Sequence, residues 1–69
     1  MKVYSVLYEV PYEGGWLVSV DGTIEEAFES TRNSAYDEEL KLTDSSSAEE
    51  YLEFTMKSGD SITIVGWDV

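Results

Sequence analysis

The fold of this chain is decided by residues 51–67, YLEFTMKSGDSITIVGW. Within residues 48–57, apolar and polar side chains alternate as they do in a strand, yet Ser47 and Glu50 form a capping box that would suit a helix. Residues 58–60, Ser-Gly-Asp, then make a short turn, and the residues that follow alternate again. Since a strand, a turn and a returning strand form a hairpin, we favour a strand within residues 48–57.

A second hairpin is predicted at the N-terminus. Residues 2–10 alternate with a period of two, and Pro11 ends this strand because it cannot donate a ladder hydrogen bond. Residues 14–15, both glycine, supply the turn, and residues 16–20 return as the second strand.

A helix is expected between the two hairpins. Thr23 and Glu26 form a capping box, and apolar residues then fall on one helical face while acids occupy the other. We expect the helix to run from about residue 23 to about residue 32 and to end at Asn33 and Ser34.

The predicted fold is therefore α+β, with one domain over residues 1–69. A short strand at residues 40–43 and a loop at residues 44–47 link the helix to the second hairpin, which gives the order ββαβββ. The sheet is antiparallel, and the helix packs on one of its faces. Trp16 and Phe28 are large aromatic residues, and we place both in the core.

Composition removes most kinds of chemistry. The chain has no Cys and no His, which excludes disulfides, thiol nucleophiles, the usual zinc ligands and the usual general base. The sequence contains no phosphate-binding glycine motif and no calcium loop. A chain of 69 residues has little room to enclose a substrate while keeping a core. We expect no cofactor, no metal and no enzymatic activity.

Charge is the most informative property. Fifteen Asp and Glu residues against four Lys and Arg give a net charge of −11. Nucleic acid and anionic membranes are poor direct ligands for such a protein, because both bind through Lys and Arg. A basic, nucleic-acid-binding protein or enzyme is the natural partner, since the field of the acids would attract it. No apolar run reaches the length of a membrane span and no signal-peptide cleavage pattern is present, so we expect a cytoplasmic protein.

Ten of the acids lie between Glu25 and Glu53, offset only by Arg32 and Lys41. If the helix and the loops after it share one edge of the sheet, their carboxylates form an anionic ridge that a DNA-binding groove would accept in place of phosphates. The alternative is that these acids are only the solvated faces of a helix and two loops. The acids that we single out for partner binding are Glu25, Glu26, Glu29, Asp37, Glu38, Glu39 and Asp44.

The second half of the chain carries a resemblance to a known family. Four short segments are similar, in order and type, to the C-terminal part of the phage uracil-DNA glycosylase inhibitors: AYDE at residues 35–38, LKLTD at residues 40–44, EY at residues 50–51 and SGD at residues 58–60. Members of that family are small, acidic, Cys-free proteins that imitate DNA and occupy the enzyme's DNA-binding groove. The resemblance implies a charge role for Asp44. It also implies that Leu40 and Leu42 form an apolar pocket for a leucine of the enzyme.

The N-terminal half departs from this family, because it is a predicted hairpin where the family has a helix. A Glu-Ser-Ile motif of the family has its nearest match at residues 29–31, Glu-Ser-Thr, which lie in the predicted helix and only a few residues before Ala35. The resemblance therefore points to DNA mimicry in general, with the glycosylase as the first target.

We expect a phage-type acidic DNA mimic that inhibits a host DNA-acting enzyme. Anti-CRISPR and anti-restriction inhibitors would leave the same composition and are alternatives. A small homodimeric regulatory or structural module, pairing through an edge strand at residues 62–67, is another. Aromatic anchors for a partner are expected at Tyr36, Tyr51 and Trp67.

Overall fold

Six regular elements follow one another in the predicted order. The computed structural model describes residues 1–36, 38–47 and 51–69, with residues 44–47 described by their backbone alone. The elements are β1 (Lys2–Val10), β2 (Gly14–Asp21), α1 (Ile24–Ala35), β3 (Leu40–Ser47), β4 (Tyr51–Met56) and β5 (Ser61–Asp68). The α+β class and the order ββαβββ are confirmed, and so is the strand within residues 48–57, over its described part.

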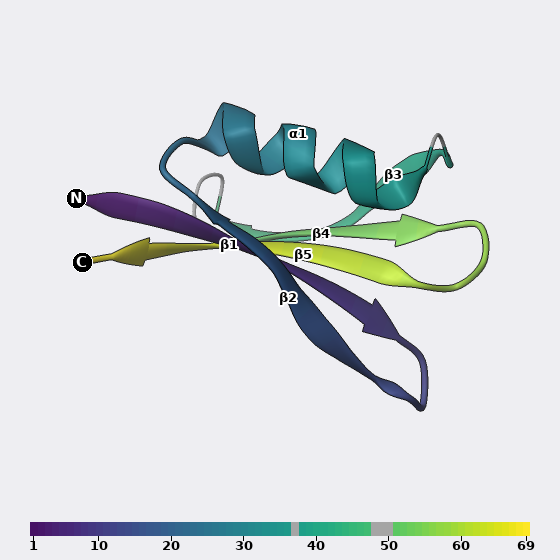
Figure 1. The fold of residues 1–69 in the computed structure, drawn as a ribbon. Coiled ribbons are helices and arrows are strands. Elements are labelled where there is room, and N and C mark those ends of the chain that lie inside the picture. Colours follow the sequence, from purple (N-terminus) through teal and green to yellow (C-terminus); the bar gives the residue numbers. More distant parts are fainter. Residues whose placement is uncertain (37, 48–50) are drawn as a thin grey trace.

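The strands form one antiparallel sheet in the order β2-β1-β5-β4-β3. The two ends of the chain meet, because β1 and β5 pair along almost their whole length (Figure 1). The Met1 amino group donates to the Val69 carbonyl oxygen at 3.1 Å, and the Val69 N–H donates to the Met1 carbonyl oxygen at 2.8 Å. The prediction that residues 62–67 form an edge strand is wrong. β5 is the central strand, so both of its backbone edges are already paired, and the edges of the sheet are β2 and β3.

The core lies between α1 and one face of the sheet (Figure 1). Alternation along neighbouring strands aligns their apolar side chains, so Ile64 of β5 lies between Val6 of β1 and Leu52 of β4. Phe28 joins this core from its margin, where it meets Phe54 edge to face with 6.2 Å between ring centroids. The buried apolar residues are Val6, Ala27, Ala35, Leu52, Met56, Ile62 and Ile64.

α1 begins as the sequence predicts and ends later. The Thr23 hydroxyl accepts from the Glu26 backbone N–H at 3.2 Å, which is the N-cap half of the capping box, and it donates to a Glu26 carboxylate oxygen at 3.0 Å, so the Glu26 side chain returns to the Thr23 hydroxyl. The helix does not stop at Asn33 and Ser34 but continues to Ala35. The reason is packing: Ala35 extends the stripe of buried residues at four-residue spacing, and this burial outweighs the weak helix propensity of Asn and Ser.

The turn between β1 and β2 lies earlier than predicted. The Glu13 N–H donates to the Val10 carbonyl oxygen at 3.1 Å and closes the turn around residues 11–13. Gly14 and Gly15 already belong to β2. Gly15 is required by close approach of the strands, because a Cβ there would collide with the Tyr8 carbonyl oxygen.

β3 is longer than predicted. The sequence pattern ends the strand at residue 43 and makes residues 44–47 a loop, but the backbone of those residues continues to pair with β4, with Asp44 opposite Glu53 and Ser47 opposite Tyr51. Two irregularities in register accompany this stretch. An edge strand faces solvent along one side, so Asp and Ser are tolerated there without the apolar alternation that marks an inner strand.

Candidate functional site

Three of the predicted acids form one surface on α1. Glu25, Glu26 and Glu29 are exposed, whereas Ala27 and Thr31 on the other side of the helix are buried against the sheet. Glu29 follows Glu25 by four residues and Glu26 by three, so it neighbours both on the helix surface and links the three carboxylates into one solvent-facing surface. We call Glu25, Glu26 and Glu29 the acidic helix face. Two of them, Glu25 and Glu26, also lie in the first turn, where negative charge suits the helix dipole.

The acids that follow α1 have different environments. Glu39 is exposed, and Glu38 is half-buried, with a carboxylate oxygen that accepts from the Ser58 backbone N–H at 3.1 Å. Glu38 therefore ties the segment after the helix to the turn between β4 and β5. Asp37 lies outside the described residues.

The residues implied by the family resemblance lie on β3. Leu40 is half-buried against the core, while the side chain of Leu42 is 52% exposed. A groove of about 680 Å³ runs beside Leu40, between β3 and β4, and both Lys41 and Lys57 line it. The side chain of Asp44 lies outside what the structure describes. Only Leu40 and Met56 among the seven lining residues are apolar, Leu42 does not line the groove, and two of the four basic residues of the chain border it.

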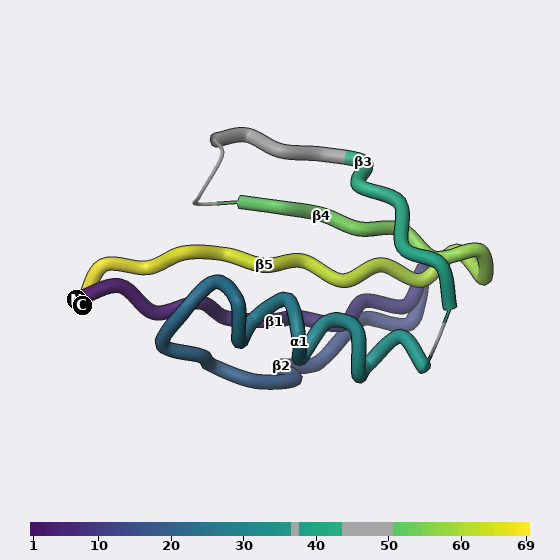
Figure 2. Tube along the Cα trace, turned by 90° about the horizontal axis from the view of Figure 1, so that it is seen from above, coloured from purple at the N-terminus to yellow at the C-terminus, as the bar shows by residue number. Residues whose placement is uncertain are grey.

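The predicted acids lie in two regions. α1 packs on β1 and β2, and β3 is the edge strand at the other side of the sheet (Figure 2). The acidic helix face and the Asp44 backbone position therefore sit over different halves of the sheet. The condition for one ridge, that the helix and the following segments share one edge, is not met, because β5 and β4 separate β1 from β3.

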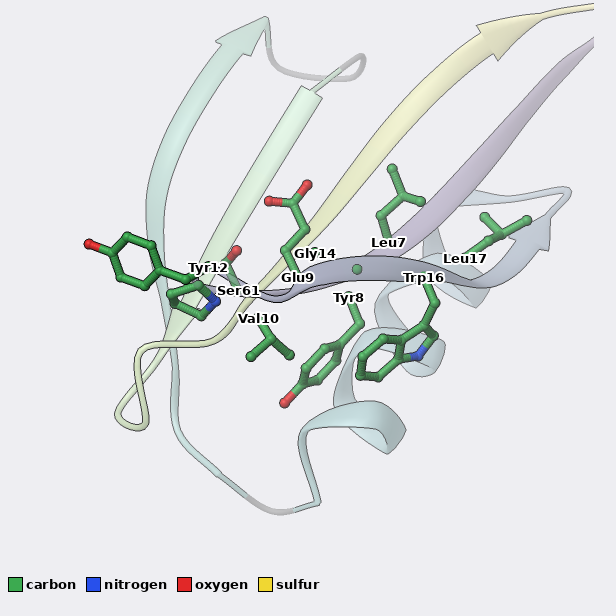
Figure 3. Close-up of a pocket in the computed structure, with 11 residues that line it drawn as sticks. Leu7, Tyr8, Glu9, Val10, Tyr12, Gly14, Trp16, Leu17 and Ser61 are labelled. Carbon is green, nitrogen blue, oxygen red and sulfur yellow. The ribbon is translucent and has the colours of Figure 1, made fainter.

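A groove that the sequence analysis missed lies where α1 ends. Trp16 pairs with Tyr8 across β2 and β1, and their rings stack with centroids 4.7 Å apart and planes 13° from parallel. Figure 3 draws a neighbouring pocket of about 690 Å³ on the same hairpin and shows both rings projecting to one side, away from Leu7 and Leu17. The groove has a volume of about 470 Å³ and is lined by Tyr8, Val10, Trp16, Leu17, Val18, Ser34, Tyr36 and Asp60. We call it the aromatic groove.

The placement of Trp16 in the core is therefore wrong: its side chain is 56% exposed. Trp16 lies on the helix-facing side of the sheet, but towards its tip the β1–β2 hairpin twists away from α1 (Figure 1), so the helix does not cover the Trp16 side chain. The signal was available in the sequence, because Trp16 comes directly after the two glycines of the hairpin, and side chains beside a hairpin turn are usually at the surface.

Tyr8 joins the aromatic groove to the β4–β5 turn. Its hydroxyl donates to Asp60 Oδ2 at 2.6 Å. This hydrogen bond, together with burial and the negative charges of Asp60 and Glu38, raises the pKa of Tyr8 from 10.0 to about 12. Tyr8 thus stays protonated near neutral pH and holds the Asp60 carboxylate in place as a charged acceptor.

The expected aromatic anchors are divided between the two faces of the sheet. Tyr36 lies at the aromatic groove and is 88% exposed. Trp67 lies on the other face, where its Nε1–H donates to Ser5 Oγ at 2.9 Å. Tyr51 is half-buried on that face, and its hydroxyl donates to a Glu53 carboxylate oxygen at 3.4 Å. Tyr36 is therefore the anchor candidate that is most accessible to a partner.

Within the part of the chain that the structure describes, no group of acidic side chains is arranged to hold a metal ion. The helix of the described residues is too short and too polar to cross a membrane. The candidate site therefore consists of an acidic helix face and an aromatic groove.

Comparison with protein families, with curated proteins and with solved structures finds no match for this chain.

Proposed function

We propose that this protein is an acidic DNA mimic that inhibits a DNA-acting enzyme by occupying its nucleic-acid-binding groove. The acidic helix face supports the proposal most directly, because it presents three exposed carboxylates on one rigid element. A net charge of −11 adds a long-range field that attracts a basic groove and speeds encounter. Such an inhibitor would act in the cytoplasm, together with its target.

The spacing of the charges supports mimicry of a phosphate backbone. Residues 25–29 span about 6 Å of helix axis at about 1.5 Å per residue. The three charges are separated by about 1.5 Å and about 4.5 Å along the axis, a mean of about 3 Å, and a DNA strand carries one charge per about 3.4 Å. Lys and Arg side chains placed to contact successive phosphates would therefore find carboxylates at a similar linear density.

Uracil-DNA glycosylase is the first target, because the segments around Ala35, Leu40 and Asp60 resemble its phage inhibitors. The test is uracil excision from a labelled oligonucleotide, with and without an equimolar amount of this protein, at low and moderate salt. We expect inhibition close to one protein per enzyme, which weakens as salt rises because the contact is electrostatic. DNA-cleavage assays with a CRISPR nuclease and with a restriction endonuclease, with and without this protein, cover the alternative targets. Full activity of every enzyme at low salt would overturn the proposal.

Two charge-matched variants separate contact from the general field. The double substitution E25Q/E29Q removes two charges from the acidic helix face, and E9Q/E13Q removes two exposed charges from the β1–β2 hairpin. We expect the helix variant to weaken inhibition about tenfold, as the loss of directly paired charges does, and the hairpin variant to weaken it about twofold through the field alone. Equal losses would show that the helix is not the contact surface.

A further inference from the structure

The aromatic groove lies outside the acidic helix face and has a chemistry of its own. Aromatic rings and a carboxylate line it, and no basic side chain is among the described residues that do so. We propose that this groove holds an arginine side chain of a protein partner, with the guanidinium against the rings of Trp16 and Tyr36 and paired with Asp60. The inference does not depend on which enzyme is bound.

The rings offer the negative faces that attract cations. Tyr8 covers one face of Trp16 in a near-parallel stack, and more than half of the Trp16 side chain remains exposed. Tyr36 projects from the end of α1 and is almost fully exposed. A guanidinium is planar and weakly hydrated, so it stacks on such rings better than an ammonium does.

The carboxylate is held ready for a charged partner. Tyr8 donates to Oδ2 of Asp60, and among the described residues Oδ1 has no hydrogen-bond partner. A carboxylate accepts several hydrogen bonds, so Asp60 keeps capacity for guanidinium N–H groups. The same groove is lined by Ser34 and Tyr36, which place the negative end of the α1 dipole beside it. Ring faces, carboxylate and helix dipole all favour a cation.

The backbone at Tyr36 gives a further argument. Tyr36 caps α1 with φ 51° and ψ 54°, a left-handed conformation in which glycine is the residue of lowest strain. Tyr12 has a left-handed backbone as well, so this conformation supports the site only because Tyr36 also lines the aromatic groove. Tyr36 gives up the stability that glycine would provide and gains a ring at the edge of the groove.

The two tryptophans allow a direct test with an internal control. In a ¹H–¹⁵N spectrum, the indole N–H of Trp16 reports on the aromatic groove and that of Trp67 reports on the opposite face of the sheet. We would titrate the protein with N-acetyl-arginine amide, with the neutral citrulline analogue of equal shape, and with N-acetyl-lysine amide. We expect the arginine probe to shift the Trp16 signal in a saturable way, to bind about tenfold more tightly than the citrulline analogue and to leave Trp67 unchanged.

Variants then locate the site. Tyr36→Gly and Asp60→Asn should each weaken binding of the arginine probe about three- to tenfold. Tyr12→Gly is the matched control, because Tyr12 is also exposed and left-handed, with φ 65°, but lines only the neighbouring pocket at the hairpin tip and not the aromatic groove. It should change the affinity less than about twofold.

Three results would overturn the inference. The first is equal affinity for the arginine and citrulline probes. The second is equal affinity for the arginine and lysine probes, which would remove the assignment to arginine, and the third is an equal loss of affinity for the arginine probe in Tyr12→Gly and Tyr36→Gly. The enzyme assays above use a different readout and different residues. Failure of DNA mimicry would therefore leave a positive arginine titration standing, and failure of the titration would leave a positive inhibition assay standing.

Discussion

The two faces of the sheet are built differently although they belong to the same strands. On the face under α1, the central positions are apolar and fully enclosed, as Val6, Ile62 and Ile64 show. On the opposite face, which no described element covers, the buried positions are polar: Ser5 is 9% exposed and Thr63 is 4% exposed. The helix supplies a second layer on one side, whereas side chains of neighbouring strands shield one another on the other.

This difference indicates where the folding free energy comes from. Residues under α1 contact both the sheet and the helix, so their removal leaves a cavity that few atoms can refill. Residues on the open face contact only their strand neighbours, and a smaller side chain there lets water approach. The open face keeps its order partly through hydrogen bonds, such as the one from Trp67 Nε1–H to Ser5 Oγ.

The largest expected effect comes from truncating the covered face. Ile62→Ala should lower the free energy of unfolding by about 2–5 kcal/mol, because Ile62 is fully buried between β1, β4 and α1. Val65→Ala, three residues later on the open face, should cost less than about half as much, because Val65 is half-buried. Urea unfolding followed by circular dichroism measures both. If Ile62→Ala does not fold, Ile62→Val should still show a loss of about 0.5–1.5 kcal/mol. Equal costs for Ile62→Ala and Val65→Ala would remove the distinction between the faces.

The alternation of apolar residues made the covered face predictable. In residues 2–10 and residues 61–67 one side of each strand is mainly apolar while the other mixes apolar and polar side chains, and the Thr23 capping box marks the start of α1. The number, type and order of the elements could therefore be predicted from the chain. The end of α1 could not, because Asn33 and Ser34 are poor helix formers that tertiary packing keeps helical. The order of the strands in the sheet could not be predicted from local sequence patterns either, because nothing in residues 62–67 shows that β1 will pair beside them.

The candidate site was only partly predictable. Acid spacing on α1 is a local property, and Glu25, Glu26 and Glu29 do lie together as expected. The aromatic groove combines residues from β1, β2, the end of α1 and the β4–β5 turn, and such a combination depends on the whole topology. Aromatic residues in strands usually lie in the core, so the sequence predicts Trp16 there, but the twist of the β1–β2 hairpin away from α1 leaves it exposed.

The buried threonines give a test in which the two faces should respond with opposite sign. Thr63 on the open face has a buried hydroxyl without a hydrogen-bond partner among the described residues, so Thr63→Val should raise the free energy of unfolding by about 1–2 kcal/mol. Thr31 under the helix donates to the Ala27 carbonyl oxygen at 2.8 Å, so Thr31→Val should lower it by about 0.5–1.5 kcal/mol. Thermal unfolding compares the pair. A loss of stability in Thr63→Val would mean that its hydroxyl is satisfied in solution.

A smaller gain in stability is expected from a substitution at Tyr36, where α1 ends. Tyr36→Gly should raise the free energy of unfolding by about 0.5–1 kcal/mol, because glycine adopts the left-handed conformation of this helix cap with less strain. Tyr36→Ala is the control, since alanine removes the ring but keeps the strain, and it should not stabilise. The same glycine variant should lose affinity for the arginine probe, so stability and binding change in opposite directions. Equal stability of the glycine and alanine variants would show that the Tyr36 backbone is not strained.

The smallest effect on stability at neutral pH, and the most specific, concerns Tyr8, which lies on the helix-facing side of the sheet beside the aromatic groove. Its pKa is raised from 10.0 to about 12 by the Asp60 hydrogen bond, so between those values the folded protein holds a proton that the unfolded chain has released. This contribution to stability is present in full below pH 10 and is lost as the pH rises towards 12. Absorbance at the tyrosinate band should show Tyr8 ionising only as the pH approaches 12.

Asp60→Asn should bring that late ionisation back towards pH 10, because an amide oxygen accepts the Tyr8 hydrogen bond more weakly than a carboxylate and carries no charge to repel a tyrosinate. Asp68→Asn is the matched control, since Asp68 is exposed at the far end of β5 and should leave the titration unchanged. Urea unfolding of the parent and of both variants at pH 9 and pH 11 then tests the linkage: the parent and Asp68→Asn should lose more stability over this interval than Asp60→Asn does. Identical losses in all three would mean that Asp60 does not hold the Tyr8 proton. The carboxylate would then be free to turn away from the aromatic groove, and the preorganised acceptor on which arginine binding depends would be absent.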